Sequence, residues 1–252
     1  LGQNPGTNHP RMMTALQKAK AKGAKIISVN PLKETGLLAF SHPQQLQGLL
    51  GVSSPLTDVF LQVKINGDMA LLKALALFML EAETQNPGTV FDRDFIRDHT
   101  TGAEAYLDSL KQYRLADLSE ACGVPLQQIR AAADLLISNK KIIACWAMGL
   151  TQHKNAVATI QEIVNLLLLK GSIGKPGAGT CPVRGHSNVQ GDRTMGINEK
   201  PPQAFLDSLE RVFGFRPPQQ HGYDVVECIH AMHTGKAKVF MAMGGNFLSA
   251  TP

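Results

Sequence analysis

Apolar residues recur with two alternating periods along the first third of the chain. Residues 12–22 and 68–81 place them at helical spacing, and Gly23 is suited to end the first of these two helices. Residues 25–30 (KIISVN) and 59–63 (VFLQV) are short, nearly continuous apolar runs, which are typical of strands buried in a parallel sheet. The alternation of helical and strand segments predicts an α/β fold.

The rest of the chain is mainly helical, with two further strand signals. Apolar runs predict strands at residues 141–146 and 238–243. Helical periodicity predicts helices at residues 92–100, 103–113, 115–122, 126–138, 155–170, 204–213 and 223–234. The first four of these form a helical insert over residues 92–139. Together, the segments predict an open, mostly parallel, Rossmann-like sheet with helices on both faces.

One long segment, residues 171–202, has almost no periodicity and is rich in Gly and Pro. Such long loops are uncommon inside a compact domain unless they serve a function. Within it, Arg184 is followed by Gly185, and its planar guanidinium could bind a carboxylate or a phosphate. A structural Arg that donates to a backbone carbonyl explains the same residue equally well. The chain shows no Ser-His-Asp set, no paired carboxylates and no metal-ligand spacing.

The composition is that of an ordinary globular protein. The chain has 252 residues, of which 44% are hydrophobic and 18% are charged. Its net charge of +5 is spread along the sequence, so the charge indicates an anionic ligand at most and argues against a nucleic-acid surface. No segment reaches the roughly 18 uninterrupted apolar residues of a membrane span.

The four cysteines, at positions 122, 145, 181 and 228, form no CxxC pair. Their spacing therefore argues against a zinc site or an iron–sulfur cluster in this chain. We expect four buried, reduced thiols and a cytoplasmic protein.

Several polar loops follow predicted strands or precede predicted helices. They are GQNPGTN (residues 2–8), Asn30-Pro31, NGD (residues 66–68) and GGN (residues 244–246). Ligands bind at the carboxyl ends of strands in such sheets, and backbone amides at a helix start favour phosphate. Each loop alone could be an ordinary connection, and Asp68 could simply be a helix N-cap. Together they predict a site for a nucleotide-like anion at the sheet edge.

Residues 114–132 also resemble a helix-turn-helix around Gly123. The second helix would offer Gln127, Gln128 and Arg130 to DNA. However, this helix continues to Ile137 and the surrounding residues are not basic, so the pattern favours a packed pair of helices.

The segment from Met148 to Gly196 resembles the central region of a known enzyme family. It contains G-x-x-Q-H, then G-x-I-G-K-P-G-x-G, then R-G-x-x-N-V-Q-G, in the order and spacing found in molybdopterin oxidoreductases of the dimethyl sulfoxide reductase superfamily. The formate-dehydrogenase-like (YdeP-like) branch is the most similar. The opening G-x-N-P and H-P motifs and the closing M-G-G-N are similar to the same family, so the resemblance covers essentially the whole chain.

The resemblance implies an enzyme whose molybdenum or tungsten is held by two molybdopterin guanine dinucleotides. Such enzymes carry out a two-electron oxidation or reduction of a small, here anionic, substrate with an unknown electron acceptor. In the family, the metal ligand and any iron–sulfur cysteines lie upstream of this region. We therefore expect a central fragment without a metal ligand, inactive alone, with no nucleic-acid partner and no membrane segment.

The resemblance also implies two domains and a role for individual residues. Residues 1–183 would form the dinucleotide-binding domain, and residues 184–252 would hold the active-site loop and part of a second α/β cofactor-binding domain. Arg184 would be the catalytic residue, beside the metal, where it orients the substrate. The residues implied to contact the cofactor are Gly2, Gln3, Asn4, Asn8, Asn30, Lys33, Gly67, Asp68, Met148, Gln152, Gly185, His186, Gly245 and Asn246. Asp68 is expected to bind guanine, and the last two residues are expected to face the other dinucleotide.

Two departures from the family pattern bear on the substrate. Asn30-Pro31-Leu32 stands where the family often has Asp-Pro-Arg, and His186 and Ser187 stand where formate dehydrogenases have Gln and Asn. The resemblance therefore does not by itself assign formate as the substrate. The alternatives are a Rossmann-like nucleotide-binding module without catalysis, which would need GxGxxG and an acid after the second strand, and a helix-turn-helix DNA-binding protein. The chain lacks the features that either requires.

Overall fold

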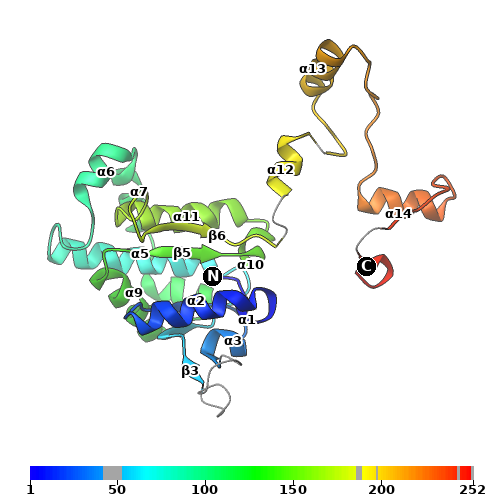
Figure 1. The fold of residues 1–252 in the computed structure, drawn as a ribbon. Helices are drawn as coiled ribbons and strands as arrows, with labels where there is room; N and C mark the ends of the chain where they lie inside the picture. The colour runs from blue at the N-terminus through cyan, green and yellow to red at the C-terminus, as the bar shows by residue number, and fades with distance from the viewer. Residues whose placement is uncertain (42–52, 186–188, 197, 243–244, 251–252) are drawn as a thin grey trace. The chain divides into compact units, whose positions relative to one another are not determined.

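The computed structural model describes residues 1–41, 53–185, 189–196, 198–242 and 245–250 (Figure 1). The chain divides into two compact units, Leu1–Gly185 and His186–Pro252. The first unit carries all of the strands that the structure describes, and the second is helical within its described residues. The two units are described separately below.

The strands of the first unit form three short two-stranded sheets. β1 (Ile27–Val29) pairs in parallel with β4 (Val59–Leu61), and β5 (Ile143–Trp146) pairs in parallel with β6 (Gly179–Pro182). A small antiparallel sheet is formed by β2 (Ala39–Phe40) and β3 (Ser54–Pro55). The structure is thus mixed α/β with short parallel sheets, which confirms the coarser part of the predicted fold.

Leu1 and Gly2 lie between the two parallel sheets and are hydrogen-bonded to both. The amino group of Leu1 donates to the carbonyl oxygen of Cys145 (2.8 Å), and the amide of Ala147 donates to that of Leu1 (3.3 Å). On the other side, the Gly2 amide donates to the Val29 carbonyl oxygen at 3.0 Å. The first pair of bonds has the staggered pattern of a parallel ladder. The order across this layer is therefore β4, β1, Leu1–Gly2, β5 and β6.

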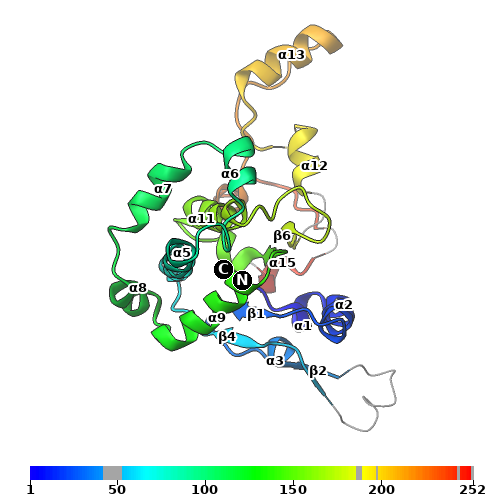
Figure 2. The same ribbon diagram turned by 90° about the vertical axis from the view of Figure 1, so that its left-hand side faces the viewer.

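The helices of the first unit gather on either side of these strands. They are α1 (Pro5–Asn8), α2 (Pro10–Ala21), α3 (Thr35–Leu38), α5 (Asp68–Gln85), α6 (Arg93–His99), α7 (Ala103–Leu110), α8 (Leu115–Cys122), α9 (Leu126–Ser138), α10 (Met148–Thr151) and α11 (Ala156–Leu169). Figure 2 shows α5, α8, α9 and α11 toward one side of the strands, and α1 and α2 toward the other.

Helix α5 forms the centre of the hydrophobic core. Its residues 71–79 are buried around most of the helix circumference, apart from Lys73, because α8, α9 and α11 surround it. It also extends four residues beyond the predicted end at residue 81. None of the described helices is both long enough and apolar enough to cross a membrane.

The segment that resembles a helix-turn-helix is a packed helical hairpin. α8 and α9 are joined through Gly123, which has a φ of 74° and ends α8 in the left-handed region. Ile129, Ala132 and Ala133 of α9 are buried, and the helix packs on α5 and β4. Arg130, a candidate DNA contact, instead forms an ion pair with Asp134 at 2.8 Å. The packed-hairpin interpretation is therefore the one that the structure supports.

Two expectations about the chain after residue 170 are wrong. The segment taken as an aperiodic loop contains β6 and α12 (Val189–Thr194). Residues 238–242 form no strand, although they are apolar; Met243 lies outside the described residues. Val239 is 88% exposed, and the described part of the second unit offers no strand with which this segment could form a ladder.

Few of the described side chains in the second unit are buried. Its other helices are α13 (Gln203–Phe213), α14 (Val225–His233) and α15 (Phe247–Ala250). α14 begins with a capping box, in which Asp224 accepts from the Glu227 amide and the Glu227 carboxylate accepts from the Asp224 amide. Among the described residues of this unit, Leu206, Pro217 and Ala231 are the buried ones.

The cysteines differ from the expectation of four buried thiols. All four are free, but Cys122 alone among them is buried, and Cys145, Cys181 and Cys228 are half-buried. Two of the half-buried thiols, Cys145 and Cys181, lie on the short strands β5 and β6.

Candidate functional site

A cavity of about 250 Å³ lies where four loops of the first unit meet. Each loop follows the carboxyl end of a strand or of the segment Leu1–Gly2. The lining residues, in chain order, are Gly2, Gln3, Asn4, Asn30, Pro31, Leu32, Glu34, Val63, Lys64, Ile65, Asp68, Gly149, Leu150 and His153. Five of the residues predicted for the cofactor, from three separate segments of the sequence, are thus brought together at one sheet edge: Gly2, Gln3, Asn4, Asn30 and Asp68.

Two glycines allow the first and last of these loops to approach closely. The Gly149 amide donates to the carbonyl oxygen of Gly2 at 3.1 Å. A Cβ atom on Gly149 would lie 2.5 Å from that same oxygen, which is too close for any side chain. Gly2 itself has a φ of +55°, a conformation that glycine adopts without strain. Because neither glycine carries a Cβ atom, the two loops can approach each other closely here.

The loop after Gly2 is held by its own side chains. Asn4 is the N-cap of α1: its Oδ1 accepts from the Thr7 amide at 3.4 Å, and its Nδ2 donates to the Thr7 hydroxyl at 3.1 Å. The side-chain nitrogen of Gln3, Nε2, contacts the sulfur of Met12 at 3.6 Å. Asn8 is exposed at the end of α1 and is not part of the cavity lining.

The loop after β1 is organised by Asn30. This residue is buried, its backbone amide donates to the Leu61 carbonyl, and its Nδ2 donates to the Leu32 carbonyl at 2.8 Å. These bonds fold the chain back over the end of β4 and place Glu34 in the lining. An acidic side chain therefore reaches this cavity even though the family's Asp is replaced by Asn30.

Asp68 begins α5 and is 7% exposed. Burial raises the pKa of its carboxyl above the ordinary value, against the opposing effects of a hydrogen bond from its own amide and of nearby His153. Gly67 precedes it but does not line the cavity; a Cβ there would lie 2.9 Å from the Cα of Cys122, so this glycine serves the packing of the turn against α8.

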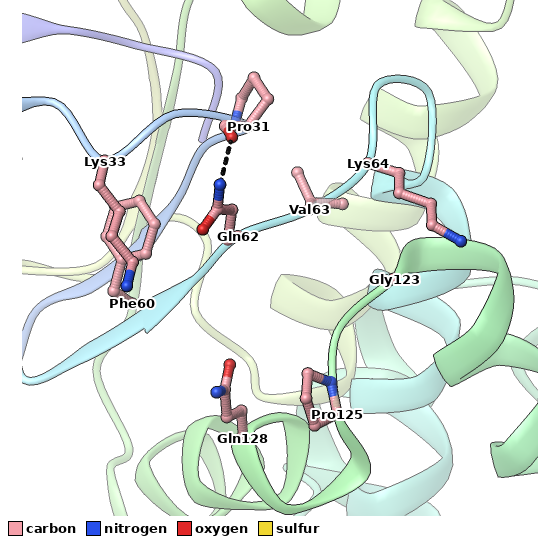
Figure 3. Close-up of a pocket in the computed structure, with 9 residues that line it drawn as sticks. All are labelled: Pro31, Lys33, Phe60, Gln62, Val63, Lys64, Gly123, Pro125 and Gln128. Atoms are coloured by element: carbon pink, nitrogen blue, oxygen red, sulfur yellow. Dashed lines mark hydrogen bonds between the residues drawn. The ribbon is translucent and has the colours of Figure 1, made fainter.

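A second cavity, of about 470 Å³, adjoins the first (Figure 3). The two share Pro31, Val63 and Lys64, so they form neighbouring parts of one surface. Lys33 lies in this second cavity, beside β4, rather than in the first. The side-chain amide of Gln62 donates to the Pro31 carbonyl oxygen at 3.0 Å and so links the end of β4 to the loop after β1.

Arg184 and its neighbours lie outside the described lining of both cavities. Arg184 is exposed after β6, and the sulfur of Met148 would lie 3.1 Å from a Cβ on Gly185. Met148, at the start of α10, and Gln152, at its end, are also exposed. The structure therefore brings Met148 next to Gly185 but separates this group from the cavity lining.

Three predicted residues fall elsewhere. His186 lies outside the described residues. Gly245 and Asn246 belong to the second unit, where Asn246 accepts from the Ser249 amide at 3.3 Å. Among the described residues, no group of three or more His, Cys, Asp or Glu side chains is placed to hold a metal ion.

Sequence reasoning missed several residues of the first cavity. Glu34, Lys64 and His153 all line it. His153 is part of the G-x-x-Q-H motif, so its motif was the available signal, whereas Glu34 and Lys64 are single polar residues without a pattern.

Comparison with known proteins shows the family of this chain. The sequence profile described as "Molybdopterin oxidoreductase" matches residues 1–251. The chain belongs to the molybdopterin oxidoreductase family. Membership of this family implies a molybdopterin cofactor with molybdenum or tungsten, and it confirms the resemblance that the motifs indicated.

Relatives in this family match the chain along its whole length. It is 55% identical over 251 residues to the uncharacterized oxidoreductase Rv2900c of Mycobacterium tuberculosis, covering 100% of this chain and 32% of that protein. It is 42% identical to the protein YdeP of Escherichia coli (100% and 34% covered) and 29% identical to formate dehydrogenase H of Escherichia coli (97% and 32% covered). The chain spans about a third of the length of these relatives.

A solved structure agrees with the architecture of this chain. Acetylene hydratase from Pelobacter acetylenicus superposes with a TM-score of 0.53 at 19% sequence identity, over 66% of this chain and 20% of that one. This chain therefore shares that fold over about two thirds of its length.

Proposed function

We propose that this chain is the central, cofactor-binding part of an oxidoreductase that carries molybdenum or tungsten on two molybdopterin guanine dinucleotides. The observation that carries the proposal is the convergence of four loops on one cavity at the carboxyl ends of parallel strands. Nucleotide cofactors of open α/β sheets bind at this edge. The identity to formate dehydrogenase H supports a formate-dehydrogenase-like reaction, a two-electron oxidation or reduction of a small anionic substrate.

The order of the strands supports a Rossmann-like assignment for the first unit. Counted along the chain, Leu1–Gly2 comes first, β1 second, β4 third, β5 fourth and β6 fifth. Across the layer they lie as third, second, first, fourth and fifth. The order reverses between Leu1–Gly2 and β5, and such a reversal opens the crevice in which dinucleotides bind. Gly2 and Gly149 lie at this reversal.

The residues at the two cavities suit a dinucleotide. Gly2 and Gly149 leave the backbone accessible, so a phosphate can approach their loops closely. The Asp68 carboxyl, which lines the first cavity, would accept hydrogen bonds from the N–H groups of guanine. Lys33, in the adjoining cavity, supplies a positive charge for the nucleotide. When bound, the cofactor supplies the two-electron chemistry at its metal.

Arg184 is the residue that we propose for substrate orientation. It is exposed at the end of β6, and its guanidinium can bind a carboxylate through two parallel hydrogen bonds. Met148, Gln152, Gly185 and His186 would line the pterin near it. Asn8 would complete the first dinucleotide loop, Gly67 the guanine-binding turn, and Gly245 and Asn246 would serve the other dinucleotide from residues 184–252.

We also propose that the 252 residues are inactive alone and act in a longer, cytoplasmic enzyme. The chain spans about a third of its relatives, and no metal ligand is expected within it. The proposal would be wrong on this point if the isolated chain reduced a dye acceptor with a candidate substrate.

The experiment that tests the proposal is cofactor analysis of the full-length protein from a host that makes the cofactor. We expect one molybdenum or tungsten atom and two pterins per chain, with two GMP released by acid hydrolysis. Pterin without GMP would exclude the guanine dinucleotide form. Absence of metal, pterin and GMP together would leave a scaffold that binds no such cofactor.

Activity of two variants then separates catalysis from binding. Arg184→Ala should lose most turnover and keep its metal and pterin, while Arg184→Lys should retain part of the activity, because a single cation remains. Equal loss of metal and activity in Arg184→Ala would show that Arg184 is structural.

A further inference from the structure

Two half-buried thiols lie side by side on the short sheet of β5 and β6. Cys145 of β5 is paired in register with Cys181 of β6. Neighbouring strands are about 4.8 Å apart, which lies within the range of about 4.4–6.8 Å between the Cα atoms of disulfides. Opposed residues in a parallel pair point to the same face of the sheet, so the two thiols share one face.

The face that carries the two thiols is partly covered, whereas Thr180 and Pro182 of β6, on the other face, are exposed. Trp146, the next residue on β5, points to the opposite face and is buried in the hydrophobic core. Cys145 and Cys181 are half-buried, so a small reagent can reach them. Cys122, by contrast, is buried, and its thiol contacts the Ser119 carbonyl at 3.5 Å.

We propose that Cys145 and Cys181 form a modification site, a cross-strand dithiol that a low-molecular-weight disulfide oxidises to an intramolecular disulfide. No step of the proposed oxidoreductase reaction uses either thiol. The inference therefore goes beyond the proposed function.

The reaction proceeds by two thiol–disulfide exchanges. The thiolate of Cys181 attacks one sulfur of the small disulfide, which breaks the S–S bond, releases one small thiol and leaves a mixed disulfide on Cys181. The thiolate of Cys145 then attacks the Cys181 sulfur and releases the second small thiol. In sum, two protein thiols and one small disulfide give one protein disulfide and two small thiols; two electrons and two protons pass from the protein to the reagent.

The environment of the two thiols sets the order of attack. Burial and the neighbouring Cys181 raise the pKa of Cys145 to about 11, so this thiol is a poor first nucleophile. In the second exchange, its reaction partner is already held on the neighbouring strand, and this proximity compensates for the small thiolate fraction.

The cross-link would join two strands that lead into the loops of the site. β5 continues into Gly149 and His153, and β6 continues into Arg184. A disulfide between the strands fixes the spacing at which these loops begin, and a thiol reductant restores the dithiol.

The test is oxidation of the full-length protein with oxidised glutathione, followed by acid quenching, alkylation of the remaining thiols and tryptic digestion without reductant. We expect one cross-linked pair of peptides, residues 142–154 with residues 171–184, that is lighter by two hydrogens than the sum of the two. Dithiothreitol should separate them. Cys122 should remain alkylated, which provides an internal control.

Two variants identify the order of the exchanges. Cys145→Ser should stop at a stable glutathione adduct on Cys181, and Cys181→Ser should leave Cys145 without an adduct. If either variant fails to fold, the cross-linking result with the protein that carries both cysteines still decides the proposal. Alkylated Cys145 and Cys181, or two separate adducts with no cross-link at high glutathione disulfide, would overturn it.

Discussion

The side chain of His9 reaches the main chain of Arg184, 175 positions further along the sequence: His9 Nε2 lies 3.2 Å from the Arg184 carbonyl oxygen. Because a carbonyl oxygen only accepts hydrogen bonds, Nε2 must carry the proton. The other ring nitrogen, Nδ1, is buried and has no hydrogen-bond partner within the described part of the chain. His9 therefore ties the loop between α1 and α2 to the end of β6, where Arg184 emerges.

Replacement of His9 by Phe should loosen the segment that carries Arg184. The ring volume is kept and the hydrogen bond is lost, at a cost of about 1 kcal/mol. We expect trypsin to cut the Arg184–Gly185 bond about fivefold faster in His9→Phe, as followed by mass spectrometry, because local opening becomes that much more frequent. His221→Phe, at an exposed histidine, is the control. An unchanged rate of cleavage would show that the contact does not restrain the segment.

The Asp68→Asn variant should bind the cofactor less tightly and fold more stably without it. Burial raises the pKa of Asp68, so the folded state disfavours the charged carboxylate. For a carboxyl with a raised pKa in the folded state, stability falls as the pH rises through its unfolded value of about 3.9 toward the folded value. Asparagine removes this penalty, so the apo-protein should gain about 0.5–2 kcal/mol at pH 7.

Thermal unfolding at pH 7 and below pH 4 distinguishes this effect from a general stabilisation. The gain in stability of Asp68→Asn should disappear below pH 4. There, the Asp68 carboxyl is protonated in both the folded and the unfolded state, so it carries no charge that burial could penalise. Asp117→Asn, at an exposed ion pair with Arg114, should show no such pattern. A lower melting temperature of Asp68→Asn at pH 7 would mean that the carboxylate instead stabilises the start of α5.

The Glu83→Gln variant should destabilise the first unit. The Glu83 carboxylate accepts from the amides of Gly88, Val90 and Phe91, at 2.7, 3.0 and 3.0 Å, and from Arg93 Nε at 2.8 Å. An amide side chain cannot accept from all four donors, so some remain unsatisfied in a buried place. We expect a loss of about 2–4 kcal/mol in urea unfolding. Glu81→Gln, two residues earlier and exposed, should change stability by less than about 0.5 kcal/mol.

The same carboxylate gives the first unit a dependence on pH with a known sign. Burial raises the pKa of Glu83, but the backbone amides and Arg93 outweigh burial and lower it below its ordinary value. The stabilisation is then present above the unfolded pKa and is lost as the pH falls through the folded one. The difference between Glu83 and Glu83→Gln should therefore narrow on acidification; a constant difference would contradict this account.

The helices were predictable from the sequence because most of them bury one continuous face. α9 has the predicted bounds, residues 126–138. α5 continues past its predicted end at residue 81 because Glu83 binds the amides of the following turn, a contact that periodicity does not encode. β6 was missed because GTCP has no strand pattern of its own, and its pairing with β5 creates the strand. Tertiary partners decide such short segments.

The candidate site was predictable only as a set of loops. The glycine- and asparagine-containing turns after strands indicated the residues Gly2, Asn30 and Asp68, which line one cavity. Whether these loops lie close together depends on the order of the strands in the sheet, which cannot be read from a single sequence. Lys64 and Glu34 contribute single side chains without a motif, so they could be recognised only in three dimensions. The role of Arg184, which lies outside the described cavity lining, stays a prediction.

The contact between Gly2 and Gly149 gives the most direct test of the cavity itself. A methyl group on Gly149 would lie 2.5 Å from the Gly2 carbonyl oxygen and 2.7 Å from its Cα, so the two loops would have to separate. We expect Gly149→Ala to lose about 1–3 kcal/mol of stability, as overpacking usually costs, and to retain less pterin in the full-length protein. Gly222→Ala is the matched control, because its nearest neighbour would lie at an ordinary 3.5 Å. If Gly149→Ala kept its stability but lost pterin, the close approach of the two loops would serve the ligand rather than the fold. If the variant kept both its stability and its pterin, the loops would have room for a methyl group, and the proposed role of their close approach in cofactor binding would be wrong.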